Sequence, residues 1–410
     1  MKQDRKYPKA LVSRKAQAAI EKGHPWVYED EIRSIEEEIA PGDLADVISD
    51  KGKYLGTGFY SPASKIRIRL ISRNANDTFD AAFWKRRIKW AWEYRKQVMG
   101  KEDLSCCRII YSESDQFPGL TVDRFGPYLV AQCLSLGMEK RKDVIYPLLA
   151  EVLREDGEEI LGLYERNDVS IRGKEGLEEN KGYYPLPGLE TPKETTAVIE
   201  ENKVKYYVDF ENGQKTGFFL DQKYNRLAVA RLSAGKNVLD CFTHTGAFAL
   251  NAALGGAKSV CGADVSESAL EMAKKNAALN GLEDKTEFIK ADIFDLLPAL
   301  EREKIKPYDF IILDPPAFTK SRKTTDNALR GYKEINYRAM KLLPRGGYLA
   351  TCSCSHFADT AKFKAMLKSA AADAGVSLRQ IEERQQAPDH PILLNVEETD
   401  YLKFFLFQVV

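Results

Sequence analysis

Residues 238–246 read Val-Leu-Asp-Cys-Phe-Thr-His-Thr-Gly, and this stretch decides the fold of the C-terminal half of the chain. A short apolar run ends in Asp240, and Gly246 then opens a segment of helical length. Glycine lets a backbone approach a ligand closely because it has no Cβ atom. A helix N-terminus behind such a turn favours negative charge. The stretch therefore predicts a strand, a tight turn and a helix that border a ligand crevice.

Further apolar runs alternate with helix-length segments from Lys236 to the end of the chain. These runs cover residues 259–264, 287–289, 310–314, 348–352 and 404–410. Such alternation is the sequence form of βαβ units. It predicts an α/β fold whose sheet is doubly wound and mostly parallel.

Acidic residues end several of these runs or follow them closely, namely Asp240, Asp264, Asp292 and Asp314. In an open α/β sheet, ligands bind outside the carboxyl ends of the strands, so these carboxylates should converge on one crevice. Asp264 has the usual spacing from Gly246 for an acid that binds ribose hydroxyls. Asp292 alone is also typical of a helix cap.

The phosphate-binding glycine fingerprints G-x-G-x-x-G and G-x-x-x-x-G-K-[ST] are both absent from the sequence. A pyrophosphate ligand would want one of them, so an NAD-dependent enzyme is disfavoured. S-adenosylmethionine carries no phosphate, and one glycine with several carboxylates suffices to bind it. The pattern therefore favours S-adenosylmethionine as the cofactor.

The rest of the chain divides into two further regions by pattern. Residues 1–75 hold short strand-like runs with glycine turns and one early helix, which predicts a small β barrel. Residues 76–195 mix helix and strand signals and predict an α+β middle domain, with residues 180–192 as a proline-containing linker or exposed loop. Residues 196–410 complete the predicted third domain.

Composition excludes several classes of protein. Lys and Arg number 61 and Asp and Glu number 61, so the molecule as a whole is not a strongly basic nucleic-acid binder, although a local basic face is sufficient for binding. Seven cysteines in irregular spacing are typical of a reducing cytoplasm, not of a disulfide framework. No apolar run reaches the length of about 18 residues that a membrane span needs, so we expect no membrane partner.

Several motifs resemble those of one enzyme family. Residues 240–246, 264–266, 291–293 and 314–318 resemble motifs I to IV of class I methyltransferases. Phe218-Phe219-Leu220-Asp221-Gln222, with Asn225 and Arg226, resembles a signature of bacterial large-subunit ribosomal RNA cytosine-5 methyltransferases. Residues 23–27 and 41–43 resemble the start of that family's PUA domain, and residues 117–124 resemble its middle domain. The resemblance covers nearly the whole chain.

This resemblance implies a cytoplasmic enzyme that forms 5-methylcytidine in 23S ribosomal RNA, with a PUA-like domain that binds RNA and with a possible homodimer. It also implies which residues bind S-adenosylmethionine. These are Asp221, Gln222, Arg226, Asp240, Phe242, Thr245, Gly246, Asp264, Ser266, Asp292, Ile293 and Asp314.

The stretch Thr351-Cys352-Ser353-Cys354-Ser355 bears on the chemical step. Cytosine C5 is a poor nucleophile, and a thiolate that adds to C6 makes C5 carbanion-like. By resemblance, Cys354 is the nucleophile and Asp314 holds N3 of the base, as a protonated acid with a pKa raised by burial. Cys352 would share the face of Cys354 if the strand stayed extended, but a small buried side chain is its more typical role. No further ligand pair accompanies these cysteines, so no metal is expected.

The predicted substrate side lies around the Asp314 loop. Pro315 and Pro316 make a rigid turn, Phe318 could stack on an extruded base, and Lys320 and Arg322 would contact the phosphate backbone or form a solvated loop. In the first domain, Lys65, Arg67 and Arg69 share one face of a strand that could contact RNA. Without the resemblance, that strand would be interpreted as a solvated edge strand.

Two alternatives stay open. A guanine or adenine nitrogen in RNA could be the methyl acceptor on the same fold, and such an enzyme would need no thiol. A non-catalytic ribosome assembly factor is the other, although the intact Asp240, Asp264, Asp314 and Cys354 argue against it. The base that removes the C5 proton is not identified, and His244 and His356 only lie near the expected crevice.

Overall fold

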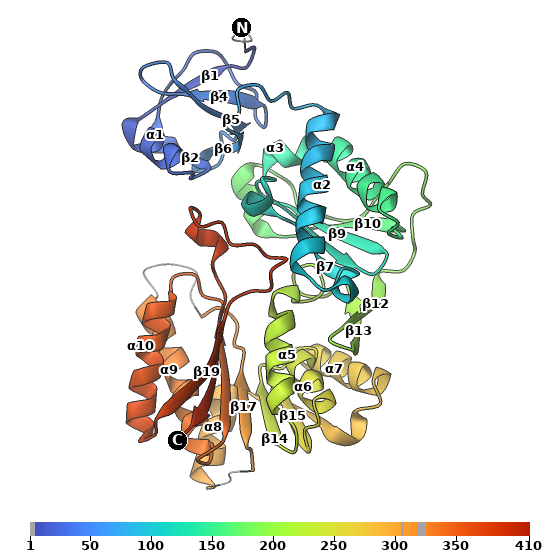
Figure 1. Cartoon of the computed structure of the whole chain (residues 1–410), viewed down its shortest axis with the longest axis vertical. Helices are drawn as coiled ribbons and strands as arrows, with labels where there is room; N and C mark the ends of the chain where they lie inside the picture. Colours follow the sequence, from blue (N-terminus) through green and yellow to red (C-terminus); the bar gives the residue numbers. More distant parts are fainter. Residues whose placement is uncertain (1–4, 305–306, 319–324) are drawn as a thin grey trace. The chain divides into compact units, whose positions relative to one another are not determined.

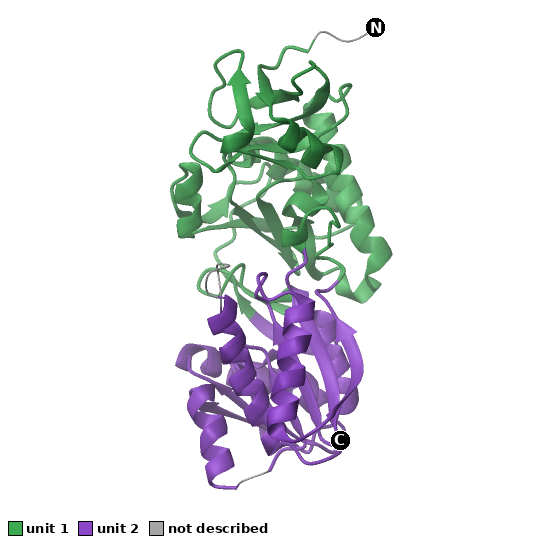
Figure 2. Ribbon diagram, turned by 90° about the vertical axis from the view of Figure 1, so that its left-hand side faces the viewer, with its two compact units in different colours: residues 1–199, 208–220, 388–399 green, residues 200–207, 221–387, 400–410 purple. Residues whose placement is uncertain are grey.

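The computed structural model describes residues 5–304, 307–318 and 325–410. The chain divides into two compact units, shown in different colours in Figure 2. The first comprises Met1–Ile199, Val208–Leu220 and Pro388–Thr399, and the second comprises Glu200–Tyr207, Asp221–Ala387 and Asp400–Val410. Segments far apart in sequence therefore complete each unit. The predicted boundaries at residues 75 and 195 stay predictions.

A six-stranded sheet forms the N-terminal part of the first unit (Figure 1). Its strands are β1 (Lys9–Val12), β2 (Trp26–Tyr28), β3 (Ile32–Ile35), β4 (Leu44–Ile48), β5 (Tyr54–Tyr60) and β6 (Ile66–Ser72), in the order β2-β6-β5-β4-β1-β3. The predicted early helix is α1 (Arg14–Glu21), which Ser13 caps by accepting a hydrogen bond from the Ala16 amide. Strand β6 lies between β2 and β5, so its interpretation as an edge strand is wrong.

A five-stranded sheet with the order β11-β10-β9-β8-β7 follows in the same unit. Its strands are β7 (Cys106–Tyr111), β8 (Leu120–Phe125), β9 (Tyr128–Cys133), β10 (Gly162–Asn167) and β11 (Asn180–Tyr184), and its helices include α2 (Ala81–Val98), α3 (Leu136–Glu139) and α4 (Lys142–Glu155). The linker predicted over residues 180–192 is wrong in its first part, since β11 pairs antiparallel with β10. An edge strand needs only one partner, so it can form from polar residues and a glycine.

The second unit contains a seven-stranded sheet with the order β16-β15-β14-β17-β18-β20-β19. Its strands are β14 (Asn237–Cys241), β15 (Ser259–Asp264), β16 (Thr286–Lys290), β17 (Phe310–Leu313), β18 (Tyr348–Ser353), β19 (Leu378–Arg384) and β20 (Lys403–Val409). The neighbouring strands β16, β15, β14, β17 and β18 are parallel to one another. Strand β20 lies between β18 and β19 and is antiparallel to both. This arrangement confirms the predicted doubly wound, mostly parallel sheet.

Six helices of the second unit and one hairpin complete the described elements that concern the site. The helices are α5 (Lys223–Leu232), α6 (Ala247–Leu254), α7 (Glu267–Leu279), α8 (Ile293–Arg302), α9 (Thr325–Leu342) and α10 (Thr360–Ala374), and the hairpin joins β12 (Thr196–Glu201) to β13 (Val204–Asp209). The sequence did not predict β19, because its residues are mostly charged and exposed at the sheet edge. Among the described residues, no helix is both long and apolar enough to cross a membrane.

The topology brings several element ends to one edge of this sheet. Parallel strands β14, β15, β17 and β18 all end there, and β20 begins there because it runs the other way. The strand order reverses between β14 and β17, which is the switch point where open α/β sheets bind ligands. The residues that follow these strands are therefore the candidates for a site.

Candidate functional site

Asp240 braces the turn between β14 and α6. Its side chain is only 1% exposed, and its Oδ2 atom accepts hydrogen bonds from Thr243 Oγ1 at 2.5 Å and from the Ala249 amide at 2.9 Å. Its Oδ1 atom has no hydrogen-bond partner among the described residues. Burial raises the pKa of Asp240 to about 7, and the negative charges of Asp314 and Asp264 act in the same direction. Three of the predicted carboxylates thus lie close enough to interact.

The turn itself has an unusual backbone. Phe242 and His244 have φ angles of 63° and 51°, in the left-handed region where residues other than glycine are strained. Gly246 has φ of 83°, and a Cβ atom there would lie 3.1 Å from Ala273 Cβ. Left-handed non-glycine residues cost roughly 1–3 kcal/mol each and cluster at ligand-binding sites. The turn therefore has the features of a ligand-binding loop.

Asp264 connects this turn to the next one. Its Oδ2 atom accepts a hydrogen bond from the His244 amide at 2.9 Å, and its Oδ1 atom accepts one from the Ser266 amide at 2.9 Å. The carboxylate is half-buried at the end of β15. Burial lowers the pKa of His244, which favours the neutral imidazole. Asp264 is therefore placed at the strand end where ribose hydroxyls are bound in open α/β sheets.

Four further predicted residues have local structural roles. Ser266 Oγ accepts a hydrogen bond from the Ala269 amide at 3.3 Å, and Asp292 Oδ1 accepts one from the Phe294 amide at 2.8 Å. These two residues cap α7 and α8. Ile293 is 1% exposed in the core, and the Thr245 carbonyl accepts a hydrogen bond from Asn276. The cap interpretation of Asp292 is confirmed, and a contact with the cofactor stays a prediction for all four residues.

The signature before β14 contacts the Asp314 side of the site. Gln222 Nε2 donates a hydrogen bond to Asp314 Oδ1 at 2.9 Å, and its Oε1 atom accepts one from Asn225. Tyr401 donates its hydroxyl hydrogen to Asp221 Oδ2 at 2.5 Å. Burial raises the pKa of Asp314 to about 6, and the charge of Asp221 raises it further. Gln222, which we predicted as a cofactor ligand, thus also contacts the acid expected to hold the base.

Arg226 is buried and forms an ion pair with Glu201, with Nη1 2.6 Å from Oε1. Its guanidinium also lies over the Phe248 ring, 5.9 Å from the centroid. The positive charge of Arg226 lowers the pKa of Asp314, opposing the effect of burial. Sequence reasoning missed Glu201 and Tyr401, because neither belongs to a local motif.

The two cysteines after Thr351 differ in their surroundings. Cys352 lies within β18 and is fully buried, and burial raises the pKa of its thiol well above the ordinary value, with the charge of Asp314 adding to the effect. Cys354 follows the end of β18 and is half-buried. A thiol must ionise and be reached in order to act as a nucleophile. The burial of Cys352 therefore favours Cys354 as the candidate nucleophile.

The turn that carries Cys354 is held from two elements. Ser355 Oγ shares a hydrogen bond of 2.8 Å with the Tyr332 hydroxyl from α9. Lys403 at the start of β20 donates from Nζ to the Ser355 carbonyl at 2.7 Å and to the Tyr401 carbonyl at 2.8 Å. The sequence analysis missed Tyr332 and Lys403. A charged residue immediately before the last apolar run was the available signal for Lys403.

The predicted RNA side is only partly described. Pro315 is buried and Pro316 is exposed, and the Phe318 ring packs 4.5 Å from the Tyr332 centroid and 5.8 Å from the Phe294 centroid. Lys320 and Arg322 lie outside the described residues.

The predicted basic face of the first domain is largely neutralised. Arg67 pairs with Glu29 at 2.6 Å and Arg69 pairs with Glu175 at 2.7 Å. These carboxylates compete with phosphate for the two guanidinium groups. Lys65 is the member of the predicted face that is exposed.

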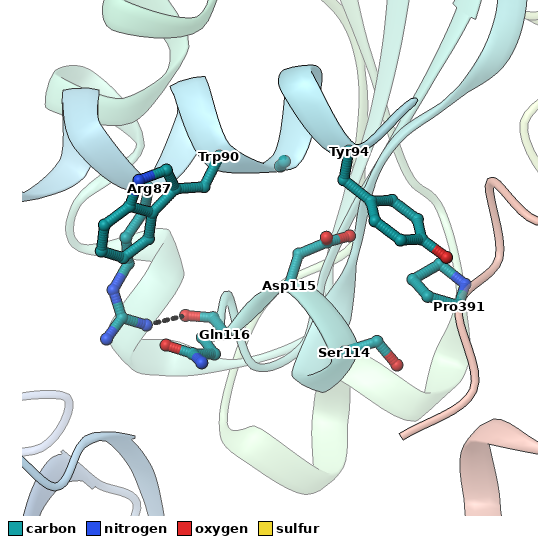
Figure 3. Close-up of a pocket in the computed structure, with 8 residues that line it drawn as sticks. Arg87, Trp90, Tyr94, Ser114, Asp115, Gln116 and Pro391 are labelled. Atoms are coloured by element: carbon teal, nitrogen blue, oxygen red, sulfur yellow. Dashed lines mark hydrogen bonds between the residues drawn. The ribbon is translucent and has the colours of Figure 1, made fainter. Parts of the chain in front are cut away.

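Each unit also contains a hollow. The one in the first unit has a volume of about 180 Å³ and is lined by Arg87, Trp90, Ala91, Tyr94, Ser114, Asp115, Gln116 and Pro391 (Figure 3). It contains no predicted site residue. The hollow in the second unit has a volume of about 280 Å³ and is lined by Thr360, Glu383, Arg384, Gln385, Lys403 and Phe405. No group of three or more His, Cys, Asp or Glu side chains in the described part of the chain could hold a metal ion.

Comparison with known proteins gives these observations a family. Residues 187–408 match the S-adenosylmethionine-dependent methyltransferase family, and residues 11–73 match the PUA-like domain. The chain is similar to Ribosomal RNA large subunit methyltransferase I of Cronobacter sakazakii, with 40% identity over 94% of this chain and 96% of that protein. The protein of the same name from Aeromonas salmonicida is 42% identical over 93% of this chain and 94% of that protein.

Solved structures agree on the fold. A Streptococcus mutans protein assigned as an S-adenosylmethionine-dependent methyltransferase superposes with a TM-score of 0.80 at 23% identity, over 98% of this chain and 99% of that one. SMU.776, crystallised with SAH, superposes with a TM-score of 0.81 at 22% identity over the same shares. The carboxylates and the strained turn at the end of β14 suit S-adenosylmethionine, which is the cofactor. The chain belongs to the S-adenosylmethionine-dependent methyltransferases and, among them, to the Ribosomal RNA large subunit methyltransferase I family.

Proposed function

We propose that this protein methylates C5 of a cytosine in large-subunit ribosomal RNA, with Cys354 as the nucleophile. The relatives that match 93–94% of the chain are named as methyltransferases of large-subunit ribosomal RNA. The observation that carries the proposal is the contrast between two cysteines. Cys352 is fully buried within β18 and its thiol interacts with Asp314, whereas Cys354 is half-buried just beyond the end of the same strand.

The cofactor half of the site would be formed by the turns after β14 and β15. When bound, S-adenosylmethionine supplies an electrophilic methyl group. Asp264 would bind the ribose hydroxyls, because its carboxylate ends β15 and is held by two backbone amides. Asp240 holds the turn through its hydrogen bonds to Thr243 and Ala249. Its buried Oδ1 atom has no partner among the described residues and could accept a hydrogen bond from the ligand. Gly246 would allow close approach of the ligand to the backbone.

Cys354 would act by covalent catalysis. Its thiolate adds to C6 of the cytosine and forms a C–S bond, which transfers the electron pair of the C5–C6 double bond to C5. C5 then receives the methyl group. A base removes the C5 proton, the electron pair reforms the double bond, and the thiolate leaves. The target base has to leave its stack, or be single-stranded, to reach this thiol.

Asp314 in its neutral, protonated form would donate a hydrogen bond to N3 of the cytosine. Its pKa is raised to about 6, so the protonated fraction falls as the pH rises through 6. Gln222 fixes the carboxyl group by donating to Oδ1. A low-dielectric site strengthens a hydrogen bond to the base ring. Burial of this acid therefore serves base binding, in the way that buried carboxylic acids donate hydrogen bonds in other enzymes.

The test compares Cys354→Ala with Cys352→Ala on large-subunit ribosomal RNA, with tritiated S-adenosylmethionine and nucleoside mass spectrometry. We expect Cys354→Ala to lose methyl transfer by at least about 10³-fold, since the covalent step has no substitute. Cys352→Ala should keep the reaction, with reduced stability. Methyl transfer to a guanine or adenine nitrogen, or normal turnover by Cys354→Ala, would contradict the proposal. If calorimetry detects no binding of S-adenosylmethionine, a non-catalytic assembly factor is the better explanation.

RNA contact and assembly are part of the proposal. The PUA-like domain at residues 11–73 supports RNA binding, although Arg67 and Arg69 are engaged in ion pairs. Contact would therefore depend on shape and on other cations of this domain. A homodimer stays a prediction.

A further inference from the structure

Lys403 is a buried cation at the edge of the sheet where the site lies. Lys403 is 4% exposed, and it pairs with Ser353 in the antiparallel register of β18 and β20. A buried ammonium is unfavourable unless hydrogen bonds and opposite charge compensate for its lost hydration. An apolar residue would continue the run Phe404-Phe405-Leu406 at no such cost. The position of this charge therefore calls for a functional explanation.

The ammonium group makes two hydrogen bonds to backbone carbonyls, one of them in the turn that carries Cys354. It donates to the carbonyl of Ser355, the residue directly after Cys354, at 2.7 Å. A second hydrogen bond of 2.8 Å goes to the Tyr401 carbonyl. An ammonium has three donors, and these carbonyls use two of them. Lys403 thus fixes the turn that carries the thiol.

The charge of Lys403 also interacts with Cys354. Burial lowers the pKa of Lys403 to about 8, and the strongest opposing influence is the negative charge of the Cys354 thiolate. Asp400 and Asp359 contribute in the same direction, but less. With a pKa of about 8, Lys403 is mostly in its ammonium form at neutral pH. Its positive charge would then stabilise a nearby thiolate.

Other charged groups near Lys403 have partners of their own. Asp359 pairs with Lys362 at 2.7 Å, and Glu383, which lines the second hollow, pairs with Lys364. Arg384 pairs with Glu382 at 3.0 Å, and Asp400 accepts from Gln385 at 3.3 Å. Tyr332, which faces the same turn from α9, has its pKa raised to about 12 by burial and stays neutral.

We infer that Lys403 is the positioning residue of Cys354, and that its ammonium group stabilises the Cys354 thiolate. A cation beside a cysteine favours the thiolate and so makes the nucleophile available near neutral pH. The thiol proton passes to water, and Lys403 keeps its own proton throughout. The role of the thiolate in methyl transfer rests on the proposed function, whereas the effect of Lys403 on the thiol does not.

The test measures alkylation of Cys354 by iodoacetamide in the full-length protein as a function of pH. The modified peptide is quantified by mass spectrometry for the natural protein, Lys403→Met and Lys403→Arg. We expect Lys403→Met to raise the midpoint by at least about one pH unit, which is about tenfold slower alkylation at neutral pH. Lys403→Arg keeps the charge and should restore the natural midpoint. Half-buried Cys261 serves as the internal control and should react equally in all three proteins.

An unchanged midpoint in a folded Lys403→Met protein would overturn the inference. If that variant does not fold, Lys403→Gln removes the charge but keeps an amide donor. The natural protein provides a second measurement, because its Cys354 should ionise at lower pH than the cysteine of an unstructured peptide with the same local sequence. A midpoint equal to or above that of the peptide overturns the inference.

The two proposals fail separately. A midpoint that depends on Lys403, in a protein that methylates no cytosine C5, would leave the inference standing and reject the proposed function. Methylation that depends on Cys354, together with an alkylation midpoint that does not depend on Lys403, would support the proposed function and reject the inference.

Discussion

At the scale of single residues, burial decides which of the acidic and thiol groups can ionise. Asp240 and Asp314 were predicted from their places after apolar runs, and both lie at the expected edge of the sheet. Their raised pKa values were predictable for Asp314 only, and only through the resemblance. For Asp240, the cause is burial, and the charges of Asp314 and Asp264 act in the same direction. Sequence position predicts that an acid is present, but packing decides its protonation.

Asp240→Asn tests the effect of this burial on stability. The pKa of Asp240 is about 7 in the folded protein and about 3.9 in an unfolded chain, so the native state binds more protons between these values. The free energy of unfolding should therefore fall as the pH rises from 4 to 7, by a few kcal/mol at most. Asparagine cannot ionise and should reduce this fall, as measured by urea unfolding of the ligand-free protein. An equal pH dependence in both proteins would contradict the assigned shift.

At the scale of elements, the turn after β14 differs from a glycine-rich phosphate loop. Two of its three left-handed positions carry Phe242 and His244 in place of glycine. The sequence therefore gave no sign of the strain, and only Gly246 was predicted to have backbone freedom. The hydrogen bonds of Asp240 and Asp264 hold the turn in this conformation. We therefore expect cofactor binding to depend on this strained turn, which is held by the buried Asp240 and the half-buried Asp264.

Paired substitutions test this strain. Phe242→Gly and Phe242→Ala both remove the ring, but only alanine has a Cβ atom that opposes a φ of 63°. The glycine variant should be more stable than the alanine variant by about 1 kcal/mol in thermal unfolding. The order should reverse at Thr245, which is not among the left-handed residues, because glycine there only adds entropy to the unfolded chain. The same order at both positions would argue against strain in the turn.

At the scale of the whole molecule, each unit is completed by segments from distant parts of the chain. Residues 388–399 follow the methyltransferase strand β19 but belong to the first unit. Within that unit, the buried Arg95 donates to the Asp389 carbonyl at 2.8 Å, and the Arg108 amide donates to Asp389 Oδ2 at 2.8 Å. The sequence placed this segment in the third domain. No local pattern reports a partner that lies almost 300 positions earlier.

Asp389→Ala in the full chain tests this attachment. Removal of the buried carboxylate deprives the Arg108 amide and His390 of their partner, which should cost about 1.5–3 kcal/mol. Calorimetry should then show a loss of several degrees in the unfolding temperature. Leu394→Ala in the same segment is the control, since Leu394 is 90% exposed and should change little. Equal effects of the two substitutions would contradict the assignment of the segment.

The sequence by itself determined the doubly wound, mostly parallel α/β sheet and the row of acids at one sheet edge. Hydrophobic periodicity and the spacing of Gly246 are local properties, so they can be read without the fold. Only the tertiary structure decided that Gln222 contacts Asp314 and that Lys403 supports the turn of Cys354. These contacts join residues that are far apart in the chain, and the antiparallel insertion of β20 creates the last of them. Burial and charge pairing arise from such contacts, and they set the chemistry of the site.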